Sequence, residues 1–237
     1  MKSVIHRART RGHVNFGWLD SYHSFSFGQY YNPERMNFGV LRVLNDDVVA
    51  GGGGFPTHPH DNMEIVSIPL RGNLAHRDSM GNEQVIREGD VQIMSAGTGV
   101  RHSEYNHSQT ESVNFLQIWV MPKQRDIAPR YAQQRFDPAL RQNQLQKVVS
   151  GQAEDGLAVW INQDASFWLG NFAAGFKTVY NLAAPDHGVY VFVLEGEIRL
   201  GDETLGRRDG IGVSAISQIE IEALADAEIL LIDVAMH

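Results

Sequence analysis

Short apolar runs alternate with turn-forming residues along most of the chain. The longest runs have the length of a β-strand and are rich in valine, isoleucine, leucine and aromatic residues. They are FGVLRVL (38–44), MEIVSIPL (63–70), VNFLQIWV (113–120), VYVFVLEG (189–196) and AEILLIDVA (227–235). Turn signals separate them at short intervals, namely LNDD, SMGN, REGD, LEGE, LGDE and RRDG. This spacing is typical of a β-sandwich or barrel, so the pattern predicts an all-β protein.

Residues 122–156 interrupt this pattern. The segment is polar, contains three prolines and has only a few short helix-like pieces, which indicates a connector. The stretches on either side share a rhythm of apolar strand, glycine turn, short strand and Gly-Asp step, which indicates a degenerate internal duplication. We therefore predict a first barrel over residues 1–135, and a connector followed by a second barrel over residues 136–237.

Composition and charge restrict the function. The chain has 237 residues and a net charge of −8, and an acidic chain without a basic stripe is not expected to bind nucleic acid directly. There is no cysteine, which excludes disulfides, thiolate metal sites and a cysteine nucleophile. Neither an apolar signal region nor a run of about 18 to 20 apolar residues is present, so we expect a cytoplasmic protein with no membrane partner.

Two pairs of polar side chains share one spacing. His58 and His60 lie two residues apart on a strand-like stretch, so they point to the same face, about 6.6 Å apart along the backbone. His102 and Glu104 repeat this arrangement. A glycine-containing stretch precedes each pair, as expected where the backbone turns tightly. No Gly-Lys-Ser/Thr follows either stretch, so a phosphate cradle is excluded.

The two pairs allow two explanations. A single His-x-His pair is more often a surface or core feature than a metal site. Two matched pairs in one barrel favour a metal centre instead, because imidazole and carboxylate groups can converge on one ion at about 2.0–2.1 Å. The sequence therefore predicts a metal site in the first barrel.

The stretches that carry these pairs resemble the two motifs of the cupin superfamily, over residues 52–72 and 89–106. The run that ends at Gly72 is one residue longer than the general pattern, and Ser95 stands where that pattern has proline. Both departures are similar to those of one branch, the pirins. Other stretches that resemble pirins are FSFGQYYNPERMNFGVLRVLNDD, HPHDNMEI, HRDSMGN, GDVQIMSAGTGVRHSEYN and PRYAQQRF.

The resemblance to pirins implies a bicupin, that is, two tandem small jelly-roll barrels with a few short helices. It also implies one mononuclear site in the first barrel, with His58, His60, His102 and Glu104 as the metal ligands. Glu64 stands at the general cupin ligand position, but pirins take their carboxylate from the HSE motif. We therefore expect Glu64 behind the ligands or in the pocket wall, where such groups orient ligating imidazoles.

The second half departs further from the cupin pattern. Asn181 and Ala183 stand where a His-x-His pair would lie, and no His-x-Glu pair follows RRDG. We therefore expect a second barrel without metal and with a structural role. His187 is close in sequence but has no matching partner, so it is expected on the surface.

A site of three histidines and one carboxylate leaves coordination positions open, which favours catalysis over a structural role. It suits one divalent transition metal; Fe(II) is favoured, and zinc, nickel, manganese, copper and cobalt also fit. The pirin resemblance implies a quercetinase, a dioxygenase that opens the central ring of a flavonol. Glu104 or Glu64 would remove the flavonol hydroxyl proton.

We expect the planar aromatic substrate to lie against an apolar wall formed by Phe38, Met63, Met94 and Trp119. The alternative function is that of a regulatory pirin, which binds a metal and docks onto a protein partner without turnover. Fold alone does not separate the two functions. Oxygen consumption with flavonols, compared with capture of a partner protein, would distinguish them.

Overall fold

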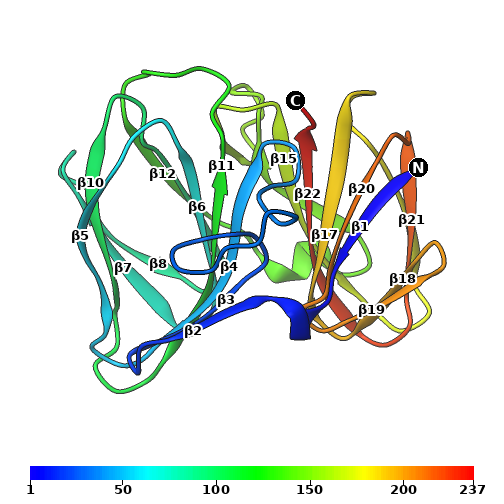
Figure 1. The fold of residues 1–237 in the computed structure, drawn as a ribbon, viewed down its shortest axis with the longest axis horizontal. Helices are drawn as coiled ribbons and strands as arrows, with labels where there is room; N and C mark the ends of the chain where they lie inside the picture. The colour runs from blue at the N-terminus through cyan, green and yellow to red at the C-terminus, as the bar shows by residue number, and fades with distance from the viewer.

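The computed structural model describes residues 1–237 and confirms the predicted all-β bicupin fold. Two β-barrels lie side by side, and their large sheets face each other in the middle of the molecule (Figure 1). Helical structure is limited to two 3-10 turns, η1 (Ala8–Thr10) and η2 (Pro138–Arg141). Neither turn has the length or apolar character that crossing a membrane requires.

The first barrel pairs a large sheet with a small one, and all neighbouring strands are antiparallel. Its strands are β2 (Gly12–Asn15), β3 (Leu19–His23), β4 (Leu41–Val49), β5 (Gly54–His60), β6 (Glu64–Arg71), β7 (Asn73–Asp78), β8 (Glu83–Arg87), β9 (Asp90–Ser95), β10 (Val100–Asn106), β11 (Val113–Val120) and β12 (Arg130–Arg135). The large sheet has the order β12-β9-β6-β11-β4-β3-β2, and the small sheet has the order β5-β10-β7-β8.

The second barrel repeats this plan, except that its edge strands β13 and β14 pair in parallel. Its strands are β1 (Lys2–His6), β13 (Leu145–Ser150), β14 (Val159–Trp160), β15 (Ala165–Phe172), β16 (Lys177–Asn181), β17 (His187–Glu195), β18 (Glu197–Leu200), β19 (Glu203–Gly206), β20 (Gly210–Ser214), β21 (Gln218–Ala223) and β22 (Ala227–Ala235). The large sheet has the order β1-β20-β17-β22-β15-β13-β14, and the small sheet has the order β16-β21-β18-β19. The strand orders correspond one to one, with β5 and β10 matched by β16 and β21.

The large sheet of each barrel has, at one edge, a strand from outside the repeated unit. β12 follows the first unit in the chain and pairs with β9. β1 precedes the first unit but pairs with β20 of the second barrel, with Ile5 opposite Ile211. The first strand of the chain thus belongs to the second barrel's sheet. The domain boundary at residue 135 stays a prediction.

Strand alternation gives the large sheets two different faces. On β6, Val66 and Ile68 join a core of 27 buried apolar residues that both barrels contribute, whereas Ile65 points into the first barrel. The two apolar clusters inside the first barrel contain only 6 and 4 buried residues. Many of the side chains that fill the rest of this interior are polar, and buried polar groups require partners or a ligand.

All five predicted strands are present, but two local predictions are wrong. LNDD is not a turn, because β4 continues through residues 44–47. Residues 122–156 are not only a connector, since they contain β12 and β13. β12 lies at a sheet edge with half-buried polar side chains, so it lacks the apolar alternation of a central strand.

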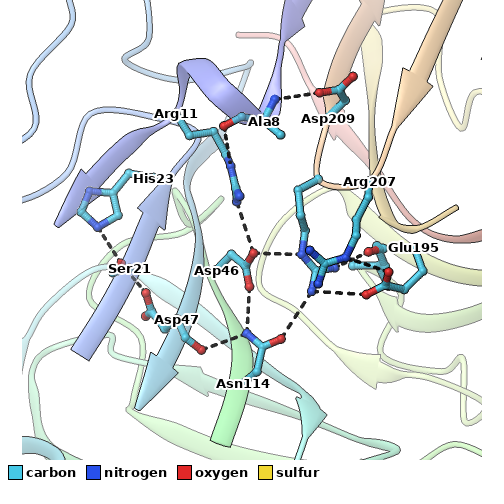
Figure 2. A network of polar contacts seen from close by, with 12 residues as sticks. Ala8, Arg11, Ser21, His23, Asp46, Asp47, Asn114, Glu195, Arg207 and Asp209 are labelled. Atoms are coloured by element: carbon cyan, nitrogen blue, oxygen red, sulfur yellow. Dashed lines mark hydrogen bonds and ion pairs between the residues drawn. The ribbon is translucent and has the colours of Figure 1, made fainter. Parts of the chain in front are cut away.

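The LNDD stretch places two buried aspartates, Asp46 and Asp47, on β4, and both have polar partners (Figure 2). Asp46 points between the barrels, where its Oδ2 accepts hydrogen bonds from Arg208 Nε at 2.9 Å and Arg11 Nη1 at 3.3 Å. Asn114 Nδ2 donates to Asp46 Oδ1 at 2.8 Å. Arg208 comes from the turn before β20, so this buried ion pair joins the two barrels.

Candidate metal centre

Three histidine side chains meet on neighbouring strands of the small sheet in the first barrel. β5 and β10 are antiparallel, and their register places His58 opposite His102. His102 Nε2 lies 3.0 Å from His58 Nε2 and 3.0 Å from His60 Nε2. The structure therefore brings together the three histidines that the sequence singles out.

This arrangement fits a transition-metal ion. Two nitrogens that each lie 2.0–2.1 Å from one ion and subtend a right angle are about 3.0 Å apart, as these nitrogens are. His58 Nδ1 lies 2.7 Å from the carbonyl oxygen of Pro56, and donating its proton there leaves Nε2 with a free lone pair. Outer hydrogen bonds of this kind hold ligating imidazoles in their binding tautomer.

Burial keeps two of these histidines uncharged. Loss of solvent, with a further contribution from the neighbouring imidazoles, lowers the pKa of His60 to about 4 and that of His102 to about 3. A histidine must be neutral to bind a metal through its lone pair. Both side chains are therefore in the ligating form at neutral pH.

Glu104 lies within reach of the same centre. With His76 and His102 it forms a second group whose potential ligand atoms all lie within 4.8 Å of one another. Its carboxylate is buried and accepts hydrogen bonds from Ser67 Oγ at 3.1 Å and Gln117 Nε2 at 2.7 Å. The register of β10 with β5 shifts between His102 and Glu104 because β5 has one extra residue between Phe55 and His58, whereas β10 and β7 stay in register across both residues.

His76 is a site residue that the sequence reasoning missed. It lies on β7 directly opposite Glu104, and its Nε2 is 3.1 Å from Asp78 Oδ2. Its Nδ1 is buried without a partner. The signal was present in the HRD of HRDSMGN, where a histidine and an aspartate stand two residues apart on one strand.

Glu64 lies apart from the cluster. It is fully buried at the start of β6, where Oε2 accepts from Ser95 Oγ at 2.7 Å and from the backbone N–H of Asn162 at 3.1 Å. Burial raises the pKa of Glu64. Its contact with Asn162 places the carboxylate at the junction with the second half of the chain, and the structure does not bring it together with the histidines.

The expected apolar wall is only partly assembled at the centre. The rings of Trp119 and His60 are 5.0 Å apart, and Met94 and Met63 belong to the cluster that packs with Trp119. Phe38 does not belong to this wall, because it packs in the core between the barrels. Phe27 contributes instead, with its ring 5.2 Å from that of Trp119.

A second polar row lines a cavity of about 180 Å³ beside Phe27. In this row Ser21 Oγ donates to Asp47 and lies 2.8 Å from His23 Nε2 (Figure 2). Burial raises the pKa of Asp47 to about 7, and the charge of Glu104 acts in the same direction. Sequence reasoning missed Asp47 because it assigned the residue to a turn.

In the second barrel, Asn181 and Ala183, which the sequence count puts in place of a His-x-His pair, are exposed. The expected surface position of His187 is wrong. His187 is buried, and its Nδ1 is hydrogen-bonded to the carboxylate of Asp233. Sequence spacing gave no sign of this contact, since the two residues are 46 positions apart and meet only through strand pairing.

The chain is similar to known proteins over nearly its whole length. Residues 4–120 match the family described as Pirin, and residues 147–234 match the family described as quercetinase C-terminal cupin domain. The chain is 44% identical to an Escherichia coli K12 protein named quercetin 2,3-dioxygenase, over 97% of each chain. It is 40% identical to a pirin-like protein of Caulobacter vibrioides, over 94% of this chain and 96% of the relative.

Solved structures show the same relationship. The bacterial pirin YhhW of Escherichia coli, solved in complex with nickel(II), superposes with a TM-score of 0.93 at 41% identity. The match covers 100% of both chains. Because fold, cupin motifs and full-length sequence similarity all agree, this chain belongs to the pirin family.

Proposed function

We propose that the protein is a metal-dependent dioxygenase that opens the central ring of flavonols. The observation that carries this proposal is the convergence of three imidazole nitrogens beside a buried carboxylate inside the first barrel. Full-length relatives that are named quercetin 2,3-dioxygenase support it. His58, His60, His102 and Glu104 would hold the ion.

A bound divalent transition metal would supply Lewis-acid and redox chemistry at this place, and Fe(II) is the favoured ion. The protein supplies the remaining parts. The buried imidazoles stay neutral and fix the position of the reacting centre, while Trp119 and Phe27 form an aromatic wall beside it. An apolar wall with a few convergent polar groups is typical of a site for a planar aromatic ligand.

Glu104 is the proton acceptor in this proposal. A carboxylate can take the proton of a flavonol hydroxyl if it is held within hydrogen-bond reach of that group. Ser67 and Gln117 each donate to one carboxylate oxygen of Glu104, so its orientation is fixed before substrate arrives. Glu64 is not assigned this step, because it lies outside both groups of potential ligand atoms around the histidines.

The test is oxygen consumption and loss of quercetin absorbance with protein loaded separately with Fe(II), nickel, manganese, copper, cobalt and zinc. Elemental analysis of freshly purified protein identifies the ion to compare first. We expect turnover with at least one redox-active ion and none in His58→Ala. His107→Ala is the matched control, since His107 is exposed and outside the cluster. Full metal loading without turnover of any flavonol would favour the regulatory function instead.

A further inference from the structure

The second barrel contains a pocket of about 670 Å³ that the proposed dioxygenase activity does not use. It is lined from β13, β15 and β16 and by the loop that leads into β17. β16 is the counterpart of β5, which carries two of the histidines in the first barrel. Asn181 and Ala183, which the sequence count puts in place of the missing His-x-His, both line this pocket. The second barrel therefore has a pocket beside the strand that corresponds to β5.

A buried carboxylate organises the polar side of the pocket. Asp233 is fully buried and accepts hydrogen bonds from Tyr180 Oη at 2.8 Å, from the backbone N–H of Ala183 at 2.9 Å and from His187 Nδ1. These three donors satisfy a charged carboxylate that would otherwise be costly to bury. The network therefore fixes the orientation of the His187 ring and keeps a proton on Nδ1.

His187 then offers one free atom to a ligand. With Nδ1 bonded to Asp233, Nε2 is the ring atom left for a ligand, and in the tautomer that carries its proton on Nδ1 it accepts a hydrogen bond. No protein group bonds to Nε2, and His187 lies in the pocket wall. A group that donates a hydrogen bond is the natural partner of this atom.

The other walls favour a neutral ligand with an apolar body. Trp168, Leu145 and Val179 line the pocket and give it apolar surface. The one lysine of the pocket, Lys147, is already paired with Asp155 at 2.8 Å. No free cation remains in the wall to attract an anionic ligand.

We propose that the second barrel binds a neutral phenol, with its ring against Trp168 and Val179 and its hydroxyl donating to His187 Nε2. This site is separate from the metal centre and needs no metal. Aromatic rings contribute apolar contact area, and the single polar contact gives specificity for the hydroxyl.

The test uses full-length, metal-free protein titrated with phenol. Binding is followed by calorimetry and by the ring-nitrogen NMR signals of the histidines. We expect saturable binding that shifts the Nε2 signal of His187 and leaves those of His58 and His102 in place. Shifts confined to the histidines of the first barrel, or no saturation up to the solubility limit of phenol, would overturn the proposal.

Two comparisons separate the hydrogen bond from general apolar binding. His187→Asn keeps an N–H donor near Asp233 but removes Nε2, so phenol should bind about tenfold more weakly, whereas the control variant His107→Asn should bind it unchanged. Methoxybenzene has no hydroxyl proton and should bind the unaltered protein about tenfold more weakly than phenol. Equal affinities for the two compounds would overturn the proposal even if His187→Asn failed to fold.

Discussion

At the scale of single residues, the two glutamates of the cupin motifs have opposite surroundings. Glu104 lies beside the histidines with both carboxylate oxygens oriented by neighbouring side chains. Glu64 is bonded to Ser95 and to the backbone of Asn162. The same residue type thus serves the candidate metal centre in one place and the junction of the two halves in the other.

We predict that Glu104→Gln weakens metal binding more than about 100-fold, because losing a ligand should exceed the 10–100-fold effect of losing an outer partner. Glu64→Gln should change metal affinity little and lower stability instead. Metal affinity measured by competition with a chelator, beside thermal unfolding, checks both variants. A larger loss of affinity in Glu64→Gln would show that the general cupin ligand set operates here.

His76 gives a second prediction at this scale. Its ring is 5.3 Å from that of His102 and its strand position is opposite Glu104, so it supports both groups from behind. We expect His76→Ala to lower metal affinity about 10–100-fold while circular dichroism shows an intact β fold. His107→Ala serves as the control. Unchanged metal affinity in His76→Ala would remove His76 from the site.

At the scale of elements, β1 depends on the protonation of one buried histidine. His6 ends β1, lies 2.9 Å from Tyr190 Oη through Nδ1 and has a buried Nε2 without a partner. Burial, with a contribution from the charge of Arg35, lowers the pKa of His6 to about 4. The unfolded chain binds this proton near pH 6.5, so folding stability from His6 is complete above that pH and is lost as the pH falls towards 4.

We therefore predict that lowering the pH from 7 to 5 costs the wild-type protein about 2 kcal/mol more than it costs His6→Gln. Urea unfolding of metal-free protein at several pH values measures the difference. β1 pairs only with β20, so hydrogen exchange of residues 2–6 should accelerate first. Parallel losses in the two proteins would mean that His6 does not control β1.

Strands with apolar alternation were predictable from the sequence, and strand segments with buried polar side chains that bond to distant residues were not. β11 and β22 match their predicted ranges because every second side chain enters an apolar core. β4 was predicted to end in a turn at LNDD. It continues instead, because its buried Asp46 and Asp47 have partners from distant parts of the chain. Local propensity contains no information about such partners.

The candidate site shows the same division. That His58 and His60 share a face was predictable, because two-residue alternation holds within one strand. Counting onward from His60 to Glu64 fails, because a turn with Asn62 at φ 46° lies between them and β6 belongs to the other sheet. The contact of His187 with Asp233 needs the register of β17 with β22, which the sequence does not state.

At the scale of the whole molecule, the two barrels are joined by an apolar core and by a buried ion pair. The Arg208 and Asp46 side chains are only 6% and 10% exposed, and Arg208 Nη1 also donates to the carbonyl oxygen of Leu194. Asp46 precedes Asp47, which faces the interior of the first barrel near Glu104. Two adjacent residues of β4 thus face the two regions: Asp46 faces the junction of the barrels, and Asp47 faces the polar interior of the first barrel.

We predict that Arg208→Ala lowers the free energy of unfolding by about 3 kcal/mol, because it leaves the carboxylate of Asp46 buried with the neutral amide of Asn114 and the longer contact to Arg11 as its side-chain partners. Arg207→Ala is the matched control. Its side chain is 60% exposed and pairs with Glu195 at the surface, so the loss should stay below about 1 kcal/mol. Urea unfolding of both variants measures the difference, and metal content should change in neither. If the two neighbouring arginines proved equally costly to remove, the ion pair would not stabilise the junction, and the apolar core alone would hold the barrels together.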